Sequence, residues 1–351
     1  MGTYKEDVSN KLKQDLQKEL NNSPVFVYDF IDYINMQNRS LRSHIAYVKD
    51  INNFLKYYST ILNKEVKHIT IDDLNKLTLR DIATEYYNYL ESHTIEVIDK
   101  GKKKLITKTN KKDTIARKIS TLKKLLKYLY KNELIESNVL EDYSAEKEKA
   151  FKLKERLDGI EITDIKQAIV NGKKNMSKRE MSAHNRLGLR NKTIFYVLAF
   201  TGIRVSELVS LDIEDIDMKR NTITVIRKND KIQEIPMQQQ LSEVLEEYLS
   251  YRRGLENVSV KKALFVSQKG TRISDQTVRM LLKEYSKEAN LEKVTCHTLR
   301  RSFLSALYNS TKDIKLVAEI GGHSVATASK YYVGIDEERY RNTIRTFNYD
   351  K

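Results

Sequence analysis

Proline and glycine are scarce in this chain, and their scarcity limits what it can fold into. Its 351 residues include two prolines and eleven glycines. All-β architectures depend on many tight turns, and turns draw heavily on these two residue types. Most of the sequence instead places apolar residues at helical spacing. We therefore expect a mainly α-helical protein with a small antiparallel β-hairpin in its C-terminal part.

Up to about residue 138, amphipathic stripes predict a small helical bundle. Ser40 precedes one stripe, and Thr78 with Asp81 precedes another, as expected of helix N-caps. The stripes begin, in chain order, at Val8, Phe26, Ile45, Ile82 and Ile115.

Lysines give this bundle a basic surface. Seven of them lie between Lys100 and Lys112 with little apolar sequence around them, which predicts a basic loop. More lie on the last helix, away from its apolar stripe. The loop and the helix supply the lysines that we expect to contact DNA, although a solvated surface would look the same: Lys102, Lys103, Lys104, Lys118, Lys124 and Lys127.

A charged stretch near residues 141–156 has almost no core pattern and suggests a linker. We therefore expect a helical domain over residues 1–140, a linker over 141–159 and a second domain over 160–351. In the second domain, residues 222–227 and 233–236 predict two strands around a polar turn, the only hairpin expected. Helices are predicted at residues 191–200, 241–251, 274–289, 299–308 and 314–320.

Charge and cysteine content bear on the partners and the compartment. Lys and Arg total 63 against 48 Asp and Glu, a formal charge of +15. Such a field favours a polyanion such as nucleic acid, although a lysine-rich composition alone could also produce it. The longest apolar run, Ile194 to Phe200, is too short to span a bilayer, and no signal-peptide core opens the chain. With Cys296 as the only cysteine, these features predict a cytoplasmic protein that does not associate with membranes.

Several common catalytic motifs are missing. The sequence has no GxxxxGK[ST], GxGxxG, HExxH or GxSxG pattern, which disfavours ATP hydrolysis, dinucleotide chemistry, zinc proteolysis and serine-hydrolase chemistry. It does contain cations and a phenol in an ordered series of motifs. These are TGIRVSEL at 201–208, HTLRRSF at 297–303 and GGHSVATASKYY at 321–332. Two arginines and two histidines from these motifs, with a lysine on the predicted hairpin turn, would suit a phosphate, and a tyrosine could be a nucleophile.

These three motifs, with the hairpin between the first two, resemble the tyrosine recombinase/integrase family. Within it the chain is most similar to the Xer type, especially the single-protein Xer form of some Gram-positive bacteria. The resemblance is strong from about residue 160 onward and only general before that. It implies a two-domain DNA clamp, with residues 1–140 as the core-binding, DNA-binding domain and residues 160–351 as the catalytic domain. The implied catalytic residues are Arg204, Lys228, His297, Arg300, His323 and Tyr332, with Glu207 orienting the site.

The nucleophile is assigned to Tyr332 and not Tyr331 because the family places it nine residues after the histidine of the third motif. In two places the chain differs from the family pattern: Arg301 stands where relatives usually have histidine, and Cys296 where many have proline. Neither residue belongs to the catalytic set.

The resemblance also implies the reaction and its partners. Tyr332 would form a 3′-phosphotyrosyl link and release a 5′-hydroxyl, with Lys228 as general acid and no ATP, metal or other cofactor. The expected partners are double-stranded DNA carrying a specific site and three further copies of the chain, docked through a C-terminal helix after Gly334. A translocase or a second recombinase could also take part.

Other functions remain open at this stage. Taken singly, each motif residue has an ordinary structural explanation, such as a salt bridge between Arg204 and Glu207. A DNA-binding protein with a degenerate site and a type IB topoisomerase-like enzyme are the two rivals. Chromosome-dimer resolution is the expected duty, and integration of a mobile element is the alternative. The sequence identifies neither the DNA target nor the duty.

Overall fold

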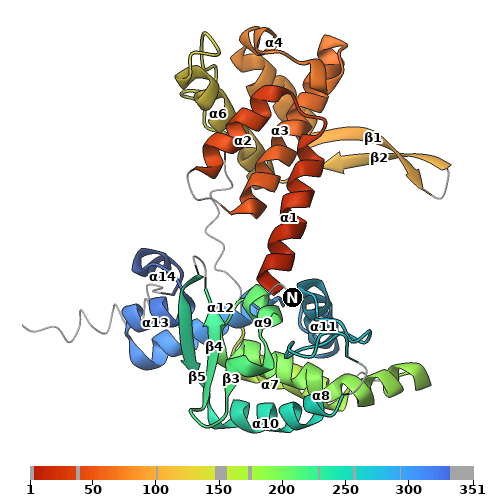
Figure 1. The fold of residues 1–351 in the computed structure, drawn as a ribbon, viewed down its shortest axis with the longest axis vertical. Coiled ribbons are helices and arrows are strands. Elements are labelled where there is room, and N and C mark those ends of the chain that lie inside the picture. Colours follow the sequence, from red (N-terminus) through yellow and green to blue (C-terminus); the bar gives the residue numbers. More distant parts are fainter. Residues whose placement is uncertain are drawn as a thin grey trace, which may run out of the picture. The chain divides into compact units, whose positions relative to one another are not determined.

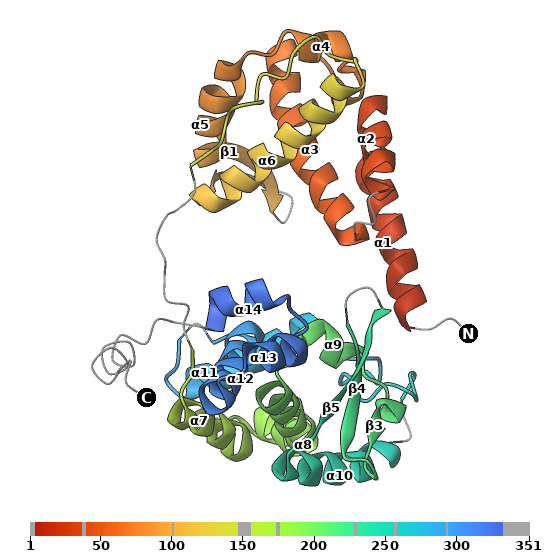
Figure 2. The same ribbon diagram turned by 90° about the vertical axis from the view of Figure 1, so that its left-hand side faces the viewer.

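The computed structural model divides the chain into two compact units, residues 1–152 and 153–351 (Figures 1 and 2). The division falls within the segment 141–159 that we expect to be a linker. The structure describes residues 4–36, 40–99, 102–146, 156–172, 176–227, 230–255, 258–292 and 294–332.

Unit 1 is a helical bundle with one projecting β-hairpin. Its core is built from the predicted apolar stripes, and Phe30, Ile51, Leu55, Ile82 and Leu122 are buried together in it. Its elements are α1 (Tyr4–Leu20), α2 (Val25–Asn35), α3 (Leu41–Leu62), η1 (Val66–His68), α4 (Ile71–Asn75), η2 (Asp81–Tyr86), α5 (Tyr87–Glu91), β1 (Ser92–Asp99), β2 (Lys102–Thr109) and α6 (Lys112–Lys131).

The caps expected from the sequence are present. Ser40 is the N-cap of α3, and its side chain accepts a hydrogen bond from the backbone N–H of Ser43. The backbone N–H and hydroxyl of Thr78 both donate to Asp81, at 2.7 Å each, just before η2. Each cap satisfies backbone groups that a helix start leaves without partners.

The predicted basic loop is wrong, because β1 and β2 form an antiparallel hairpin of eight residue pairs from Ser92↔Thr109 to Asp99↔Lys102. The expectation of a single hairpin in the chain fails with it. Alternation in this segment is hard to recognise because lysine occupies both faces of β2, and none of residues 92–96 and 103–109 is buried.

Unit 2 is also mainly helical and carries the second hairpin, so the predicted fold class is confirmed. Strands β3, β4 and β5 form one antiparallel sheet in that order. The five predicted helices are present: four extend further than predicted, and α11 is one residue shorter at each end. Helices α7, α9 and α14 were not predicted. The elements are α7 (Gly159–Asn171), α8 (Lys178–Thr201), α9 (Val205–Ser210), η3 (Ile213–Asp215), β3 (Ile216–Asp217), β4 (Thr222–Ile226), β5 (Ile232–Pro236), α10 (Gln239–Arg253), α11 (Asp275–Glu288), α12 (Cys296–Thr311), α13 (Ile314–Gly321) and α14 (Val325–Tyr332).

Helix α8 is the central helix of unit 2. Its segment from Ile194 to Ala199 is buried all round, which explains why the sequence is continuously apolar there. A smaller apolar cluster joins α12, α13 and α14 and includes Leu304, Val317 and Tyr332. None of the helices in the described ranges is long and apolar enough to cross a membrane.

Candidate active site

Arg204 lies where α8 ends and α9 begins. Gly202 terminates α8 with φ of +62°, a conformation that favours glycine. A Cβ at this position would also lie 2.6 Å from Cδ1 of Phe303. The turn at Gly202 therefore fixes where Arg204, the N-cap residue of α9, leaves the helix.

Glu207 is a buried carboxylate that joins two arginines. Its Oε1 accepts a hydrogen bond from Nη1 of Arg204 at 2.8 Å, and its Oε2 accepts one from the backbone N–H of Arg204 at 2.7 Å. The guanidinium of Arg227 donates to Oε2 as well. Glu207 is only 6% exposed, and because a buried carboxylate is costly unless it is paired, these two arginines offset the cost of burying it. Its predicted orienting role is consistent with this position.

Arg227 is part of this cluster, although the sequence analysis did not identify it. It follows the last residue of β4, is 7% exposed, and donates from Nε to Gln233 and from Nη2 to the carbonyl of Ile320. Its backbone N–H donates to the carbonyl of Lys231 and closes the turn. A period-two pattern could have revealed it, because Ile223, Val225 and Arg227 share the buried face.

Arg300 enters from α12 and is almost fully buried, with 2% exposure. Its Nη1 donates to the carbonyl of Gly202 at 2.5 Å, and its Nη2 to the carbonyl of Gly321. Its Nε is buried without a hydrogen-bond partner. Burial, followed by the charge of the neighbouring Arg204, lowers the pKa of Arg300 to about 10. The guanidinium is still protonated at neutral pH.

His323 follows the end of α13, within hydrogen-bonding distance of Arg300. Nη2 of Arg300 lies 3.1 Å from Nε2 of His323. Because arginine can only donate, this pairing requires a neutral imidazole with its proton on Nδ1. Burial is the largest of the causes that together lower the pKa of His323 to about 4, and the charges of Arg300, Arg204 and the nearby His297 are the next largest. His297 itself is exposed on the first turn of α12.

The two adjacent tyrosines at the end of α14 have different surroundings. Tyr332 is 4% exposed, and its ring centroid lies 6.2 Å from that of His323. Tyr331 is 37% exposed, and its backbone carbonyl accepts a hydrogen bond from Arg156. Burial raises the pKa of the Tyr332 phenol, and the positive charge of Arg300 opposes this shift. Tyr332 is thus the tyrosine that packs beside the cluster.

The remaining predicted residues either lie outside the described residues or belong to unit 1. Lys228 lies outside the described residues, as does the C-terminal helix expected after Gly334. In unit 1, Lys118 is half-buried and donates to Asn53 at 2.9 Å, and burial lowers its pKa. The other lysines expected to contact DNA lie on β2 and α6. Lys103 pairs with Glu96, Lys124 donates to the Tyr47 hydroxyl, Lys104 and Lys127 are exposed, and Lys102 begins β2.

The cluster carries more positive than negative charge. Three guanidiniums, those of Arg204, Arg227 and Arg300, surround the one carboxylate of Glu207 among the described residues of the cluster. The excess charge, the unpartnered Nε of Arg300 and the half-exposed Arg204 favour binding of an anion. Planar guanidiniums suit the oxygens of a phosphate in particular.

Comparison with known proteins agrees with this chemistry. Residues 172–339 match the phage integrase family. Tyrosine recombinase XerC from Thermodesulfovibrio yellowstonii is 32% identical over 237 residues, which cover 66% of this chain and 74% of that protein. The chain belongs to the phage integrase family. It is a tyrosine recombinase of the Xer type, so it breaks and rejoins DNA strands.

Two further comparisons extend over most of the chain. Tyrosine recombinase XerC from Pelotomaculum thermopropionicum is 27% identical over 92% of this chain and 97% of that protein. The crystal structure of XerH site-specific recombinase bound to difH substrate has a TM-score of 0.62 and 23% identity. It covers 89% of this chain and 82% of that one, and at this identity it supports the fold alone.

Removing the charge of Arg227 should impair strand cleavage more than DNA binding. Arg227→Met leaves Glu207 paired only with Arg204 and releases the anchor to α13. We expect cleavage to fall by about 10-fold or more with little change in affinity, because the cluster acts on the transition-state charge. Covalent adduct yield and gel-shift affinity measure the two effects. The matched control is Arg220→Met, since Arg220 lies just before β4 in an exposed pair with Glu234. Equal cleavage by both variants would contradict this role.

The lowered pKa of His323 predicts a pH dependence of stability. Its imidazole titrates near 6.5 in the unfolded chain and near 4 when folded, so the unfolded state binds more protons between these values. The free energy of unfolding should therefore fall as the pH is lowered through this window. The slope of the unfolding free energy against pH reports the difference in bound protons between the unfolded and folded states. His323→Gln should reduce this difference by up to one proton, whereas replacing the exposed His68 should not. Urea denaturation at several pH values tests this, and parallel slopes for all three proteins would refute it.

Proposed function

We propose that the chain recombines duplex DNA at a specific site through a covalent link between Tyr332 and a 3′-phosphate. The observation that carries the proposal is the buried Tyr332 beside His323 and Arg300, in a cluster with excess positive charge. A phosphodiester supplies the anion that such a cluster favours, and the phenol supplies the nucleophile.

The reaction balances without any further reactant. The Tyr332 phenol gives its proton to a solvent water, and its oxygen attacks the scissile phosphorus while the bond from phosphorus to the 5′-oxygen breaks. The leaving 5′-oxygen takes a proton from Lys228 and departs as a hydroxyl. Reversal of the step by the 5′-hydroxyl of another strand restores the phosphodiester and the phenol. The link preserves the phosphodiester energy, so neither ATP nor a metal is needed.

Each cation has a proposed task at the phosphate. Arg204 and Arg300 hold the non-bridging oxygens, and the unpartnered Nε of Arg300 gives an incoming oxygen a donor. His297 and His323 hydrogen-bond the same group. A bound phosphate would raise the pKa of His323 from its low value, because a negative charge offsets the cations around it. Glu207 positions the arginines and does not touch the DNA.

Lys228 is proposed as the general acid because the preceding residue, Arg227, is hydrogen-bonded within the cluster. Arg227 fixes the end of β4 to Glu207 and to the carbonyl of Ile320, next to the cluster. Arg227, the residue that precedes Lys228 in the chain, therefore lies beside the proposed phosphate site. A lysine ammonium can donate the proton that the leaving 5′-oxygen needs.

Both units are proposed to contact the duplex. On α6 of unit 1, Lys124 and the exposed Lys127 supply positive charge for phosphates, and Lys118 is a weaker candidate because it donates to Asn53.

The biological duty that we propose for this chain, as a cytoplasmic protein, is Xer-type resolution of chromosome dimers. The proposal is supported by similarity to a Xer recombinase over 92% of the chain. Footprinting across the replication terminus of the host tests it, and a bound site at the end of a mobile element would favour integration instead. A translocase or second recombinase remains a proposed partner.

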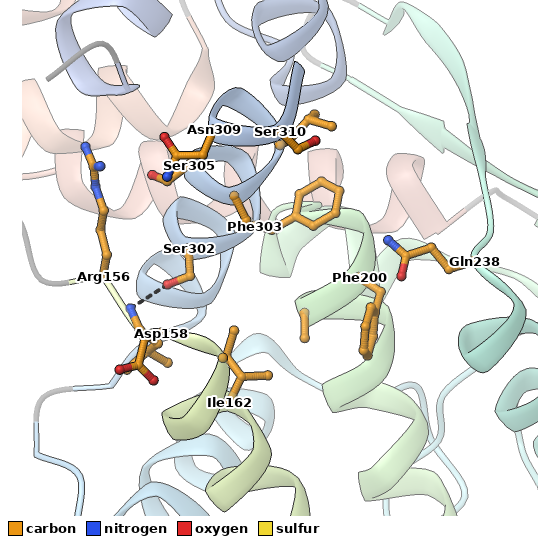
Figure 3. Close-up of a pocket in the computed structure, with 15 residues that line it drawn as sticks. Arg156, Asp158, Ile162, Phe200, Gln238, Ser302, Phe303, Ser305, Asn309 and Ser310 are labelled. Atoms are coloured by element: carbon orange, nitrogen blue, oxygen red, sulfur yellow. Dashed lines mark hydrogen bonds between the residues drawn. The ribbon is translucent and has the colours of Figure 1, made fainter. Parts of the chain in front are cut away.

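We further propose that four copies assemble on DNA through the C-terminal tail. The sequence predicts a helix there with Tyr340, Ile344 and Phe347 on one face. A mostly apolar pocket of about 660 Å³ in unit 2 offers a place for such a face on a neighbouring copy (Figure 3). Phe200 and Ile162 point into it, Phe303 contributes from α12, and Arg156 and Gln238 lie at its margins.

The covalent step is tested by replacing each tyrosine of the adjacent pair in turn. Tyr332→Phe should bind DNA normally and form no adduct, because only the attacking oxygen is lost. Tyr331→Phe is the matched control and should form adduct normally. A duplex nicked near the cleavage position traps the adduct in an SDS-resistant form. Adduct from Tyr332→Phe and none from Tyr331→Phe would transfer the role to Tyr331, and adduct from both would exclude the pair.

Assembly is tested by removing the tail or filling the pocket. A chain ending at Gly334 should bind DNA as a monomer with little loss but should not form pairs on a full site or recombine. Ala306→Trp places a large side chain at the pocket lining and should have the same effect with the tail intact. Native gels with half-sites and full sites measure both. Cooperative assembly by the truncated chain would contradict the role of the tail. Cooperative assembly by the Ala306→Trp variant would contradict the role of the pocket.

A further inference from the structure

The β1–β2 hairpin of unit 1 projects from the bundle without packing on it along most of its length (Figure 1). Eight residue pairs give a ribbon of roughly 27 Å. Only its base is held, where the His93 ring stacks on Tyr89 and its Nδ1 lies 2.8 Å from the carbonyl of Tyr89. Because an isolated two-stranded hairpin is marginally stable in water, a ribbon of this length is expected to contact something.

The two faces of the ribbon differ in chemistry. Directly paired residues share a face, so Ser92 and Thr109 lie with Thr94 and Thr107 on one of them. We call this the threonine face, and these four residues at its base are all exposed. Toward the tip, the same face also carries Glu96, Leu105 and Lys103. The opposite face carries His93, Ile95, Lys104, Ile106 and Lys108.

The charge of the ribbon is strongly positive. Residues 92–112 contain seven lysines and two acidic residues, Glu96 and Asp99. Glu96 is already paired with Lys103 at 2.7 Å. The described lysines Lys103, Lys104 and Lys108 are exposed. This charge is complementary to a polyanion, and it would repel the same ribbon of a second copy.

The dimensions match one polyanion well. The major groove of B-DNA is about 12 Å wide and accepts a two-stranded β-ribbon, whose strands lie about 5 Å apart. Threonine hydroxyls and methyl groups can contact base edges, and flexible lysines can reach phosphates on both sides. An exposed apolar side chain such as Leu105, 71% exposed, can contact thymine methyl groups.

We propose that the β1–β2 hairpin lies in the major groove of duplex DNA, with its threonine face toward the bases and its lysines on the phosphates. The hairpin thereby adds sequence recognition that the catalytic cluster does not supply. The inference rests on the proposed function, since it assumes that the chain binds duplex DNA.

The phosphate contacts are tested through the salt dependence of binding. Lys103→Gln, Lys104→Gln and Lys108→Gln combined in the full chain should lower the slope of log K against log salt by about 3 on a mixed-sequence duplex. The control combines Lys56→Gln, Lys67→Gln and Lys131→Gln, three exposed lysines of unit 1 outside the hairpin with the same change of charge. Equal slopes for the two triple variants would overturn the phosphate contacts.

Base contacts are tested by selecting binding sites from a randomised duplex library. In one variant, Asn-Gly replaces residues 95–106 and joins the paired Thr94 and Thr107 by a two-residue turn. In a second variant, Thr94→Val and Thr107→Val remove the hydroxyls and keep the shape. We expect the first to select a motif shorter by about three base pairs or more, and the second to lose discrimination within that stretch. Motifs identical to that of the unchanged chain would overturn base recognition.

The outcomes separate this inference from the proposed function. If the shortened hairpin keeps the motif and the salt slope but loses cooperative pairing of copies, the ribbon contacts a second copy and the DNA proposal is wrong. If hairpin variants bind and recombine as the unchanged chain does, the inference fails and the recombinase function stands. If the unchanged chain forms no covalent DNA adduct, the proposed function fails first.

Discussion

The cationic cluster of unit 2 depends on one buried carboxylate. Glu207 accepts hydrogen bonds from Arg204 and Arg227, which come from a helix start and a strand end that are 23 residues apart. A carboxylate this deeply buried is costly unless it is paired, and either arginine alone would leave it incompletely compensated. The pairing therefore joins α9 to the end of β4. It also leaves the cluster with net positive charge, because Arg300 has no carboxylate partner among the described residues.

Helix ends provide the rest of the support for these guanidiniums. Arg300 donates to the carbonyls of Gly202 and Gly321, and Arg204 to that of Gly322 at 3.1 Å. These carbonyls belong to the C-terminal ends of α8 and α13, which lack partners within their own helices and carry partial negative charge. The arginines satisfy the carbonyls, and the helix ends favour the charged form of the arginines. A site that holds its cations in this way needs little rearrangement when a phosphate arrives.

The sequence predicted the parts of the fold and site that depend on local signals. Amphipathic stripes, caps and ordered motifs identified the main helices and pointed to Arg204, Arg300 and Tyr332, which the structure places in or beside one cluster. It did not identify Arg227, because its role depends on Glu207, Gln233 and Ile320, and only the fold brings these together. The β1–β2 hairpin was missed for a different reason. A strand with no buried face has no pressure to alternate apolar and polar residues, so its pattern resembles that of a loop.

The two hairpins of the chain use the same geometry under opposite constraints. In β4–β5 the inward residues are buried, and Arg227 and Gln233 fix the end of the hairpin to α13. Its stability comes from unit 2 itself. The side chains of the β1–β2 ribbon whose burial the structure describes are mostly exposed, so its cross-strand hydrogen bonds must offset the conformational entropy of eight residue pairs with little help from packing. A surface under that constraint gains most from a partner that contacts its whole length and neutralises its lysines, and duplex DNA does both.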